Sequence, residues 1–444
     1  MQKSAGKNLH FGPSTALPAR ARFARAGIAI KSCAMIQLAY LFERFPSFTQ
    51  TFCYREVMEL RRQGVTPTIF SIRRPTGEPP QNWDSALVRQ VHHLPDEPEL
   101  LHLVERAMKR KQISSDAIRA IEQWGRQSDF LRLYQAAYVG ARLSEGVWLH
   151  AHFAGMAART AYWMKQFFDI DFSFTAHAND IFAPRPFVIG LDRLLATANA
   201  VITESDHAAN FLRKKFPASA PKIHRVYNGL EVASFPQADF AGPIPLIISV
   251  GRLIEKKGFA DLLEACRLLN HAGQEFQCEI IGEGALEAAL RRQIERGNLI
   301  GKVKLVGPQT QEQIKRRLAA ATVFVLPCTM EASGGTDNLP TVIMEAMAVG
   351  LPVVSTSIAG IPEMVEDGVT GELVLPGEPK ALATAIEHFI TDCSRAREFG
   401  SRGRELARKK FSIENSVREL LALFQQARQI SQNKSTVSNL RVGD

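Results

Sequence analysis

The sequence predicts an α/β protein with two doubly wound, Rossmann-like domains that face each other across a central cleft. Strand-like runs alternate with helix-like runs through most of the 444 residues, which is typical of parallel sheets covered by helices on both faces. The alternation lapses once, between residues 230 and 244, and so divides into two series. Hydrophobic residues make up 45% of the chain, which is enough apolar material for two separate cores.

The first series, residues 35–229, predicts the first domain. Its expected strands are 35–42, 66–72, 147–153, 171–177, 200–205 and 222–229. Its expected helices are 49–63, 154–168, 187–197 and 206–216, with further helical sequence up to about residue 143. A polar, proline-rich stretch spans residues 73–98.

The second series, residues 245–410, predicts the second domain, and residues 230–244 are the linker between the two. Expected strands are 245–251, 277–282, 302–307, 322–327 and 352–356, and expected helices are 257–270, 285–296, 310–320 and 341–349. Short loops join these elements, and right-handed crossovers make a doubly wound sheet the simplest arrangement. Ligands of such sheets bind beyond the carboxyl ends of the strands.

The charge distribution argues against a nucleic-acid partner. Of the net charge of +9, residues 1–34 contribute six basic residues and no acidic one, so the rest of the chain is nearly balanced. No basic stripe with interleaved aromatic residues is found. Residues 1–34 are predicted to be a disordered basic tail. Two other interpretations stay open, a translation start at Met35 and an Arg-rich transit peptide.

Two further classes are excluded by composition. No run approaches the roughly 18 apolar residues that a membrane-spanning helix needs. The six cysteines are scattered without CxxC spacing, which argues against a zinc site or a disulfide framework and indicates reduced thiols in a cytosol-like compartment.

The segment SVGRLIEKKG, residues 249–258, suggests a phosphate site. Gly251 ends a buried strand and permits close approach of a ligand to the backbone. Arg252 and Lys257 follow, where a helix amino terminus adds positive potential, and these groups suit a diphosphate. The alternative is two solvated bases in a loop. The similar strand end IIGEGALE contains Gly282 and Gly284, which alone indicate only a tight turn.

The most informative segment is CTMEASGGTDNLPTVIMEAMAVGLPVVST, residues 328–356. Pro340 suits the first helical position, with Asn338 or Leu339 as the cap. Asp337 then lies in the loop after a strand and Glu345 in the following helix, so that both acids face the cleft. Carboxylates are suitable acceptors for sugar hydroxyl pairs, and the free N–H groups at the helix start suit an anion. The alternative is a core helix with one stray glutamate.

Histidines follow two strands of the first series. LHAHF contains His150 and His152, and FTAHANDIF contains His177 and Asp180. His177 and Asp180 suit contacts with sugar hydroxyls, whereas a histidine at a strand end is often purely structural. No third ligand with suitable spacing supports metal binding by the HxH pair, so no metal site is predicted.

Four of these segments together resemble the donor-binding domain of glycosyltransferase family 4. They are VGRLIEKKG, IGEGALE, VFVLP and DNLPTVIMEAMAVGLPVVST, in that order. FERFPSFTQTF and the two histidine segments resemble the branch of the family that builds bacterial exopolysaccharides, including colanic-acid-type enzymes. Residues 411–428 are similar to the closing helix that crosses back to the first domain, which leaves residues 429–444 as a polar tail. The resemblance covers about nine-tenths of the chain and implies the GT-B fold.

The resemblance also implies roles for individual residues. Arg252 and Lys257 match the pair that binds the donor diphosphate and stabilises the leaving group. Asp337 and Glu345 match the E-x7-E acids that contact the transferred sugar and the ribose, although this chain has Asp where the family usually has Glu. His177 matches the histidine near the transferred sugar. The further matches are Gly251, Gly282, Gly284, Leu339 and Pro340 at the donor, and Phe48, Thr49 and Asp180 on the acceptor side.

The implied activity is metal-independent transfer of a hexose with retention at the anomeric carbon. The donor is a nucleotide sugar, UDP before GDP, and the acceptor a saccharide or lipid-linked saccharide for exopolysaccharide or a related glycan. The expected location is the cytoplasm, including peripheral contact with the inner face of the membrane. The segment KRKQ, residues 109–112, either contacts anionic lipid there or forms a solvated helix face. Two alternatives are a non-catalytic sugar-nucleotide-binding subunit and a nucleotide-sugar epimerase of the same fold, which lacks the E-x7-E-like helix.

Overall fold

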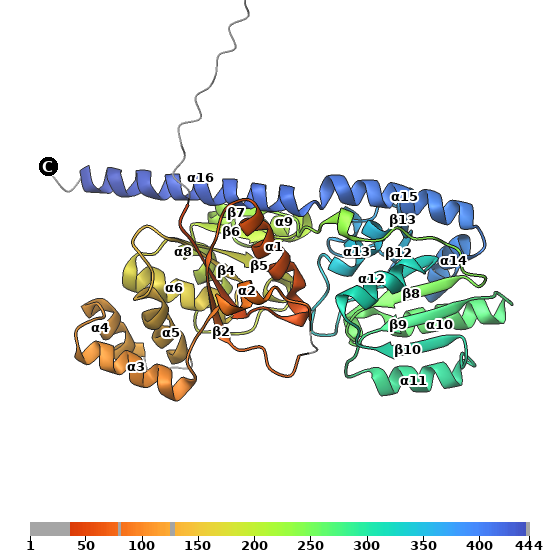
Figure 1. Ribbon diagram of the computed structural model, residues 1–444, viewed down its shortest axis with the longest axis horizontal. Coiled ribbons are helices and arrows are strands. Elements are labelled where there is room, and N and C mark those ends of the chain that lie inside the picture. Colours follow the sequence, from red (N-terminus) through yellow and green to blue (C-terminus); the bar gives the residue numbers. More distant parts are fainter. Residues whose placement is uncertain (1–35, 79–80, 125–128, 441–444) are drawn as a thin grey trace, which may run out of the picture. The chain divides into compact units, whose positions relative to one another are not determined.

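The computed structural model describes residues 36–78, 81–124 and 129–440. The predicted basic tail, residues 1–34, lies outside these described residues. These described residues form one compact unit that contains two separate parallel sheets (Figure 1). No helix in the described ranges has an apolar stretch long enough to cross a bilayer.

The first sheet has seven parallel strands in the order β3-β2-β1-β4-β5-β6-β7. The strands are β1 (Leu38–Arg44), β2 (Thr68–Arg73), β3 (His92–His93), β4 (Trp148–His152), β5 (Phe172–Ala176), β6 (Ala200–Thr203) and β7 (Ile223–Arg225). The chain changes direction across the sheet between β1 and β4, and this switch point is where ligands of doubly wound sheets bind.

Helices surround the first sheet, and several elements of this domain differ from expectation, including β3 and α7, which were not predicted. The helices are η1 (Phe48–Gln50), α1 (Thr51–Arg62), α2 (Ser85–Arg89), α3 (Glu97–Lys109), α4 (Ser115–Trp124), α5 (Phe130–Gly140), α6 (Met156–Phe168), α7 (Ala178–Phe182), α8 (Leu191–Thr197), α9 (Asp206–Lys215) and η2 (Pro217–Lys222). The polar stretch 73–98 contains α2, which Asp84 caps by accepting from the Leu87 N–H at 2.6 Å. The helix expected from residue 187 begins only at Leu191, after its N-cap Gly190, which has extended backbone with ψ 175°.

The second sheet has six parallel strands in the order β10-β9-β8-β11-β12-β13. Its strands are β8 (Leu246–Val250), β9 (Gln277–Ile281), β10 (Val303–Gly307), β11 (Val323–Leu326), β12 (Val353–Thr356) and β13 (Gly371–Val374). Its helices are η3 (Val232–Ser234), η4 (Glu255–Lys257), α10 (Phe259–His271), α11 (Glu287–Arg296), α12 (Gln311–Ala319), α13 (Thr341–Val349), η5 (Ile361–Glu363), α14 (Pro379–Ile390) and α15 (Cys393–Lys410). Three of the four residues of β13 are only partly buried, so it lacks the apolar run by which the other strands were predicted. The switch point lies between β8 and β11.

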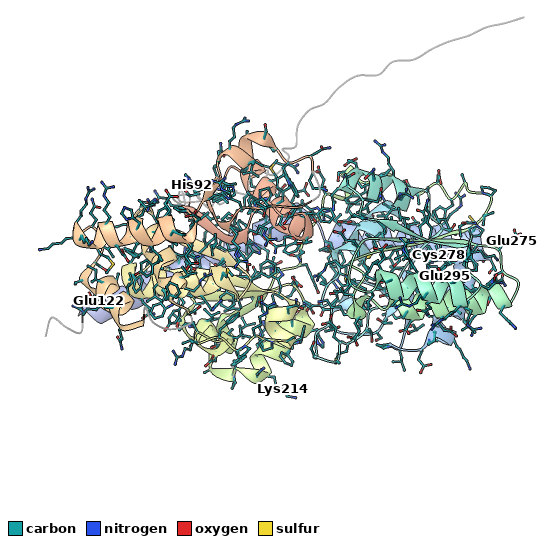
Figure 2. All side chains as sticks on the ribbon, turned by 90° about the horizontal axis from the view of Figure 1, so that it is seen from below. His92, Glu122, Lys214, Glu275, Cys278 and Glu295 are labelled. Atoms are coloured by element: carbon teal, nitrogen blue, oxygen red, sulfur yellow. The ribbon has the colours of Figure 1, made fainter. Side chains whose placement is uncertain are left out.

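Each domain has its own apolar core, and the charged side chains that are buried include Glu204 and Glu345. The central strands are buried along their whole length, as in β4 and β5, because parallel sheets are covered on both faces. Figure 2 labels Lys214, Glu275 and Glu295, which are exposed, and Cys278, which is 1% exposed.

The last helix, α16 (Ile413–Leu440), returns the chain to the first domain (Figure 1). Its apolar residues Ile413, Val417, Leu420 and Phe424 recur every three or four positions and join the cluster that contains Tyr40 and Trp148 of the first sheet. The helix was expected to end at residue 428. It continues to Leu440 through sequence without an apolar stripe, and for that reason periodicity did not predict the extension.

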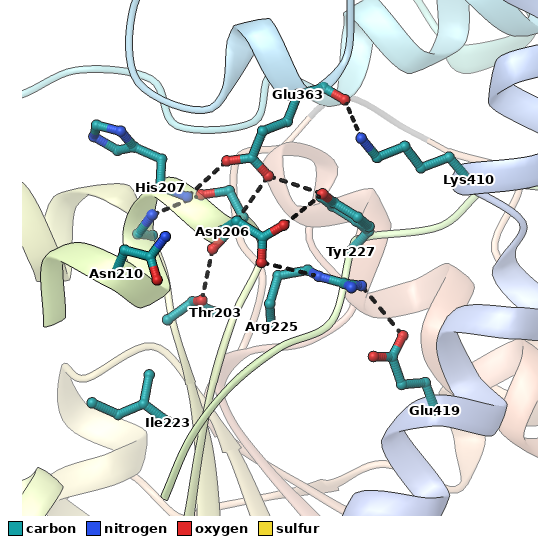
Figure 3. A network of polar contacts seen from close by, with 12 residues as sticks. Thr203, Asp206, His207, Asn210, Ile223, Arg225, Tyr227, Glu363, Lys410 and Glu419 are labelled. Carbon is teal, nitrogen blue, oxygen red and sulfur yellow. Dashed lines mark hydrogen bonds and ion pairs between the residues drawn. The ribbon is translucent and has the colours of Figure 1, made fainter. Parts of the chain in front are cut away.

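A network around Glu363 connects the two domains (Figure 3). The Glu363 carboxylate lies after the second-domain strand β12 and accepts the backbone N–H groups of Asp206 and His207 at 2.8 and 2.7 Å. It also accepts the Tyr227 hydroxyl at 2.9 Å. Lys410 donates to the Glu363 carbonyl oxygen at 2.6 Å. A carboxylate of one domain therefore caps helix α9 of the other, a favourable position for negative charge.

Candidate active site

The central pocket, with a volume of about 350 Å³, is lined by strand ends of both sheets. The predicted site residues that line it are Thr49 and His177 from the first domain and Arg252, Lys257, Asp337, Leu339 and Pro340 from the second. The central pocket therefore combines residues that follow the carboxyl ends of strands in both sheets, where the sequence predicted ligand binding. Phe48, Asp180, Gly251, Gly282, Gly284 and Glu345 do not line it.

The cations of the central pocket surround Asp337. Lys257 forms an ion pair with Asp337 Oδ2, and Lys256 Nζ lies 3.3 Å from Oδ1. Burial alone would raise the pKa of Asp337, but the two ammonium groups hold it below its usual value. Burial also opposes the charge of Lys257, whereas Asp337 raises the pKa of this lysine above its ordinary value. Arg252, which is exposed, also lines the central pocket. The three cations Arg252, Lys256 and Lys257 therefore outnumber the Asp337 carboxylate.

Lys256 is a functional candidate that sequence analysis missed. It is 4% exposed and donates to Asn179 Oδ1 of the first domain at 3.0 Å. Its place beside Lys257 was a visible signal, but a second lysine in a loop is usually solvated. Its burial depends on Asn179, which lies 77 positions away.

Gly258 allows the lysine-bearing turn to pack against the neighbouring strand. It has φ 67° and is the N-cap of α10. A Cβ at this position would lie 1.7 Å from the Pro327 carbonyl oxygen. Because Pro327 follows β11, the glycine brings Lys257 to the Cys328–Asp337 loop across the switch point of the second sheet.

The glycines of IIGEGALE contact another loop in this structure. A Cβ on Gly282, which has φ 142°, would lie 1.9 Å from the Gly251 carbonyl oxygen. A Cβ on Gly284 would lie 2.5 Å from the carbonyl oxygen of Leu253. These glycines therefore permit tight packing behind the Arg252 loop, and their contact with a nucleotide stays a prediction.

Glu345 lies apart from the central pocket and is paired across the two domains. It is 2% exposed, and its Oε1 accepts from Arg55 Nη2 at 2.6 Å. Arg55 also donates to Gln311 at 2.9 Å. Sequence analysis predicted that Asp337 and Glu345 both face the cleft. It missed Arg55, which lies 290 positions from its partner Glu345. A ribose contact of Glu345 stays a prediction.

The start of helix α13 corrects one detail of the sequence analysis. Pro340 was expected at the first helical position, but it is the N-cap, with ψ 111°, and the helix begins at Thr341. Leu339 and Pro340 still line the central pocket next to this helix start.

His177 belongs to a buried chain of polar side chains. Its Nδ1 lies 2.6 Å from Glu204 Oε2, and its Nε2 lies 3.4 Å from His152 Nδ1. His152 Nε2 lies 3.2 Å from Glu56 Oε1, which also accepts the Tyr40 hydroxyl at 2.5 Å. Burial would lower the pKa of His177, but the Glu204 carboxylate raises it above its ordinary value. His177 is therefore poised to carry positive charge in the central pocket.

His150 has a structural environment. It is fully buried, and its two ring nitrogens lie 2.8 Å from Ser173 Oγ and 3.1 Å from Thr175 Oγ1. Burial lowers its pKa well below the ordinary value. Glu56 lies close enough to His150 and His152 for the three to be candidate metal ligands, a grouping that sequence spacing did not reveal. Each of these histidine nitrogens already has a partner among the described residues: two hydroxyls for His150, and Glu56 and His177 for His152.

Asp180 caps the start of α7. Its Oδ2 accepts the backbone N–H groups of Ala154 and His177, both at 3.0 Å. It lines a cavity next to the central pocket, so contact with an acceptor stays a prediction. The contacts that it makes here hold the His177 backbone in place.

Replacing Asp180 with alanine is expected to lower the free energy of unfolding by about 1 kcal/mol, because two backbone donors lose their acceptor. Asp180→Asn retains a side-chain oxygen and is expected to lose less. Urea unfolding of both variants measures the difference. Equal stability of Asp180→Ala and the parent would show that the cap contributes nothing.

Comparison with known proteins identifies the family of the second domain. Residues 233–406 match the family described as glycosyl transferases group 1. These residues belong to that glycosyltransferase family. The resemblance to glycosyltransferase family 4 is thereby confirmed.

The relatives include proteins of exopolysaccharide synthesis. The chain is 49% identical over 140 residues to the amylovoran biosynthesis glycosyltransferase AmsK of Erwinia amylovora, covering 32% of this chain and 34% of AmsK. It is 40% identical over 200 residues to WcaL of Escherichia coli, named for colanic acid biosynthesis, covering 44% of this chain and 49% of WcaL. The matches thus span about a third to a half of these relatives.

Solved structures confirm the predicted GT-B fold. Sucrose-phosphate synthase from Thermosynechococcus elongatus has a TM-score of 0.68 at 19% identity, with 88% of this chain and 98% of that chain covered. HepE of Anabaena, solved with UDP, has a TM-score of 0.62 at 18% identity, with 90% of this chain and all of that chain covered. At these identities the likeness establishes the fold alone.

Proposed function

We propose that the protein is a retaining glycosyltransferase that moves a hexose from a UDP-sugar to a saccharide or lipid-linked saccharide in exopolysaccharide synthesis. The observation that carries this proposal is the central pocket, where Arg252, Lys256 and Lys257 face His177 from the opposite domain. A pocket with excess positive charge suits a diphosphate leaving group. The related HepE structures contain UDP or UDP-glucose, and this favours UDP over GDP.

In the proposed reaction, the protein's own cations stabilise the departing diphosphate. The developing negative charge lies against Lys256, Lys257 and Arg252, so the step does not require a metal ion. The acceptor hydroxyl attacks the face that the diphosphate leaves, and its proton passes to the departing diphosphate oxygen. The configuration at the anomeric carbon is thereby retained. Contacts between the domains exclude water from the donor and so limit hydrolysis.

Asp337 changes partner in this proposal. Before the donor binds, its carboxylate is held by Lys256 and Lys257. The donor diphosphate competes for the same ammonium groups and releases carboxylate oxygens toward the hydroxyls of the transferred sugar. The side chain is one methylene shorter than glutamate, so the sugar must lie correspondingly closer to the loop.

The remaining expectations belong to the same proposal. We keep residues 35–229 as the acceptor-side domain, 230–244 as the linker and 245–410 as the donor-binding domain, with α16 as the closing helix. Glu345 is proposed to bind ribose, which requires Arg55 to release it. The site of action is proposed to be the inner face of the cytoplasmic membrane.

A thermal-shift panel with UDP, GDP and ADP, each with and without EDTA, tests the donor site. A ligand at ten times its Kd should stabilise the folded state by about 1.4 kcal/mol. We expect UDP to raise the Tm, with no change on adding EDTA. Release of UDP from a UDP-sugar in the presence of an acceptor extract tests the transfer itself. Failure of every nucleotide to stabilise the protein would contradict the proposal.

A further inference from the structure

A second cavity adjoins the central pocket on the side of the first domain. It has a volume of about 520 Å³ and shares Gln50, Phe153 and Asn179 with the central pocket as lining residues. We call it the arginine pocket, because Arg73, Arg159 and Arg185 also line it. A molecule bound there reaches the central pocket past three shared side chains.

The arginine pocket is built at strand ends of the first sheet. Arg73 ends β2, and Phe153 follows β4. Helix α6 also begins at this cavity, because its N-cap Gly155 is a lining residue. Gly155 provides no side-chain cap, so the positive end of the helix dipole adds to the arginine charges.

The carboxylates of the arginine pocket already have partners. Asp180 Oδ2 accepts two backbone N–H groups. Glu43 Oε1 lies 3.5 Å from Arg73 Nη1, and Asp129, behind the cavity wall, forms an ion pair with Arg159. Each of these acids therefore has at least one partner, although Asp129 Oδ2 is buried without a hydrogen-bond partner among the described residues.

Two arginines have unused donors: Arg185, which lines the cavity, and Arg132, which does not line it but interacts electrostatically with Arg159. Exposed Arg185 has no hydrogen bond or ion pair with any residue that the structure describes. Arg132 is 6% exposed, and its Nη1 is buried without a hydrogen-bond partner in the described ranges. Burial and the neighbouring Arg159 lower the pKa of Arg132 to about 10. Guanidinium groups with unused donors suit carboxylate and phosphate oxygens, which accept in a bidentate manner.

The cavity also has apolar walls. Phe187 lies under the Arg159 guanidinium, 3.6 Å from the ring centroid, and Phe153, Met156 and Leu191 are further lining residues. A bare inorganic ion does not need such surfaces. A sugar ring does, because it has apolar C–H faces as well as hydroxyls.

We infer that the acceptor is a saccharide with an anionic group, a carboxylate or a phosphate, which the arginine pocket binds beside the donor. This inference rests on the proposed function and names its acceptor class. The anion is held by Arg73 and Arg185, and the sugar packs against Phe153 and Phe187. A sugar hydroxyl then reaches the central pocket past Gln50 and Asn179.

Calorimetric titration of the full chain saturated with UDP tests the inference. The affinities of cellobiouronic acid and cellobiose are compared to test recognition of a carboxylate. The affinities of glucosyl farnesyl diphosphate and farnesyl glucoside are compared to test recognition of a phosphate. At least one anionic probe is expected to bind about tenfold more tightly than its neutral match, the equivalent of one hydrogen bond to a charged group. The pair that shows the preference identifies the source of the anion.

Substitutions of the pocket arginines test whether the preference for anionic probes arises in the arginine pocket. Arg185→Gln and Arg73→Gln are expected to remove most of the tenfold preference, and Arg106→Gln, on an exposed position of α3, is the matched control. Equal affinity for charged and neutral probes, no binding of any probe, or a preference that survives both variants would overturn the inference. The UDP-induced thermal shift is measured in parallel. If it persists while the preference fails, the proposed donor site stands and only the acceptor class is wrong.

Discussion

Replacing Lys257 with methionine is expected to lower kcat/KM for sugar transfer about 100- to 1,000-fold, the usual effect of removing one group that stabilises charge in a transition state. Lys257 is only 12% exposed at its side chain and is paired with Asp337, so its ammonium acts in a poorly solvated site where charge is weakly screened. The largest part of the loss is expected in kcat, because the negative charge on the diphosphate grows as the bond to the sugar breaks.

The fold of the Lys257→Met variant is expected to persist, since Lys256 remains 3.3 Å from Asp337. The lowered pKa of Asp337 means that its pairing stabilises the protein above the unfolded value of about 3.9 and that this contribution is lost as the pH falls through the folded pKa. The stability difference between parent and variant should therefore shrink in acid.

Steady-state kinetics, UDP titration and urea unfolding at pH 7 and below pH 3 measure these effects. Lys380→Met, at an exposed position of α14, is the control for general loss of charge. A Lys257→Met variant with unchanged turnover would remove this lysine from the mechanism.

The fold could be predicted because its signals are local. Central strands such as β4 and β5 are buried on both faces, and they appear in the sequence as continuous apolar runs between helical segments. Arg252, Lys257 and His177 could be selected for a related reason, since polar residues directly after such strands lie at the ligand-binding edge of the sheet.

Side chains that depend on distant partners could not be predicted in this way. Arg55 and Glu345 meet only after both domains have folded and come into contact, and no local pattern in either segment marks the pair. Glu204 differs, because it directly follows strand β6. It carries the same strand-end signal as His177 and could have been selected by the same rule. Helix α16 extends beyond its apolar stripe. Periodicity therefore predicted the contact of this helix with the first domain but not the residue at which the helix ends.

Glu204 leads to the second large expected effect. Replacing it with glutamine is expected to lower kcat/KM about 100-fold at pH 8, with a smaller loss near pH 6. The carboxylate lies 2.6 Å from His177 Nδ1 and is the principal group that holds the pKa of this histidine above its ordinary value against the effect of burial. Glutamine retains the shape and an oxygen but removes the charge, so His177 loses its proton at a lower pH.

Two pH-dependent measurements separate this positioning role from simple damage to the fold. In the parent, activity should decline as the pH rises through the raised pKa of His177, and in Glu204→Gln the decline should move to lower pH. The stabilising contribution of the charged pair is complete below the unfolded histidine pKa of about 6.5 and is lost as the pH rises through the folded pKa. The difference in free energy of unfolding should therefore be largest in mild acid and diminish in mild alkali.

Glu56→Gln is the matched comparison, because Glu56 belongs to the same buried chain but is hydrogen-bonded to His152 and Tyr40. Its hydrogen bonds reach His177 only through His152, and its charge raises the pKa of His177 less than the charge of Glu204 does, so its substitution should shift the pH profile less than Glu204→Gln does. If both variants lose activity equally at every pH, the charge on His177 does not drive catalysis, and Glu204 acts only by orienting the His177 ring through its hydrogen bond. A shift confined to Glu204→Gln would instead assign the imidazolium to the group of cations that surrounds the departing diphosphate.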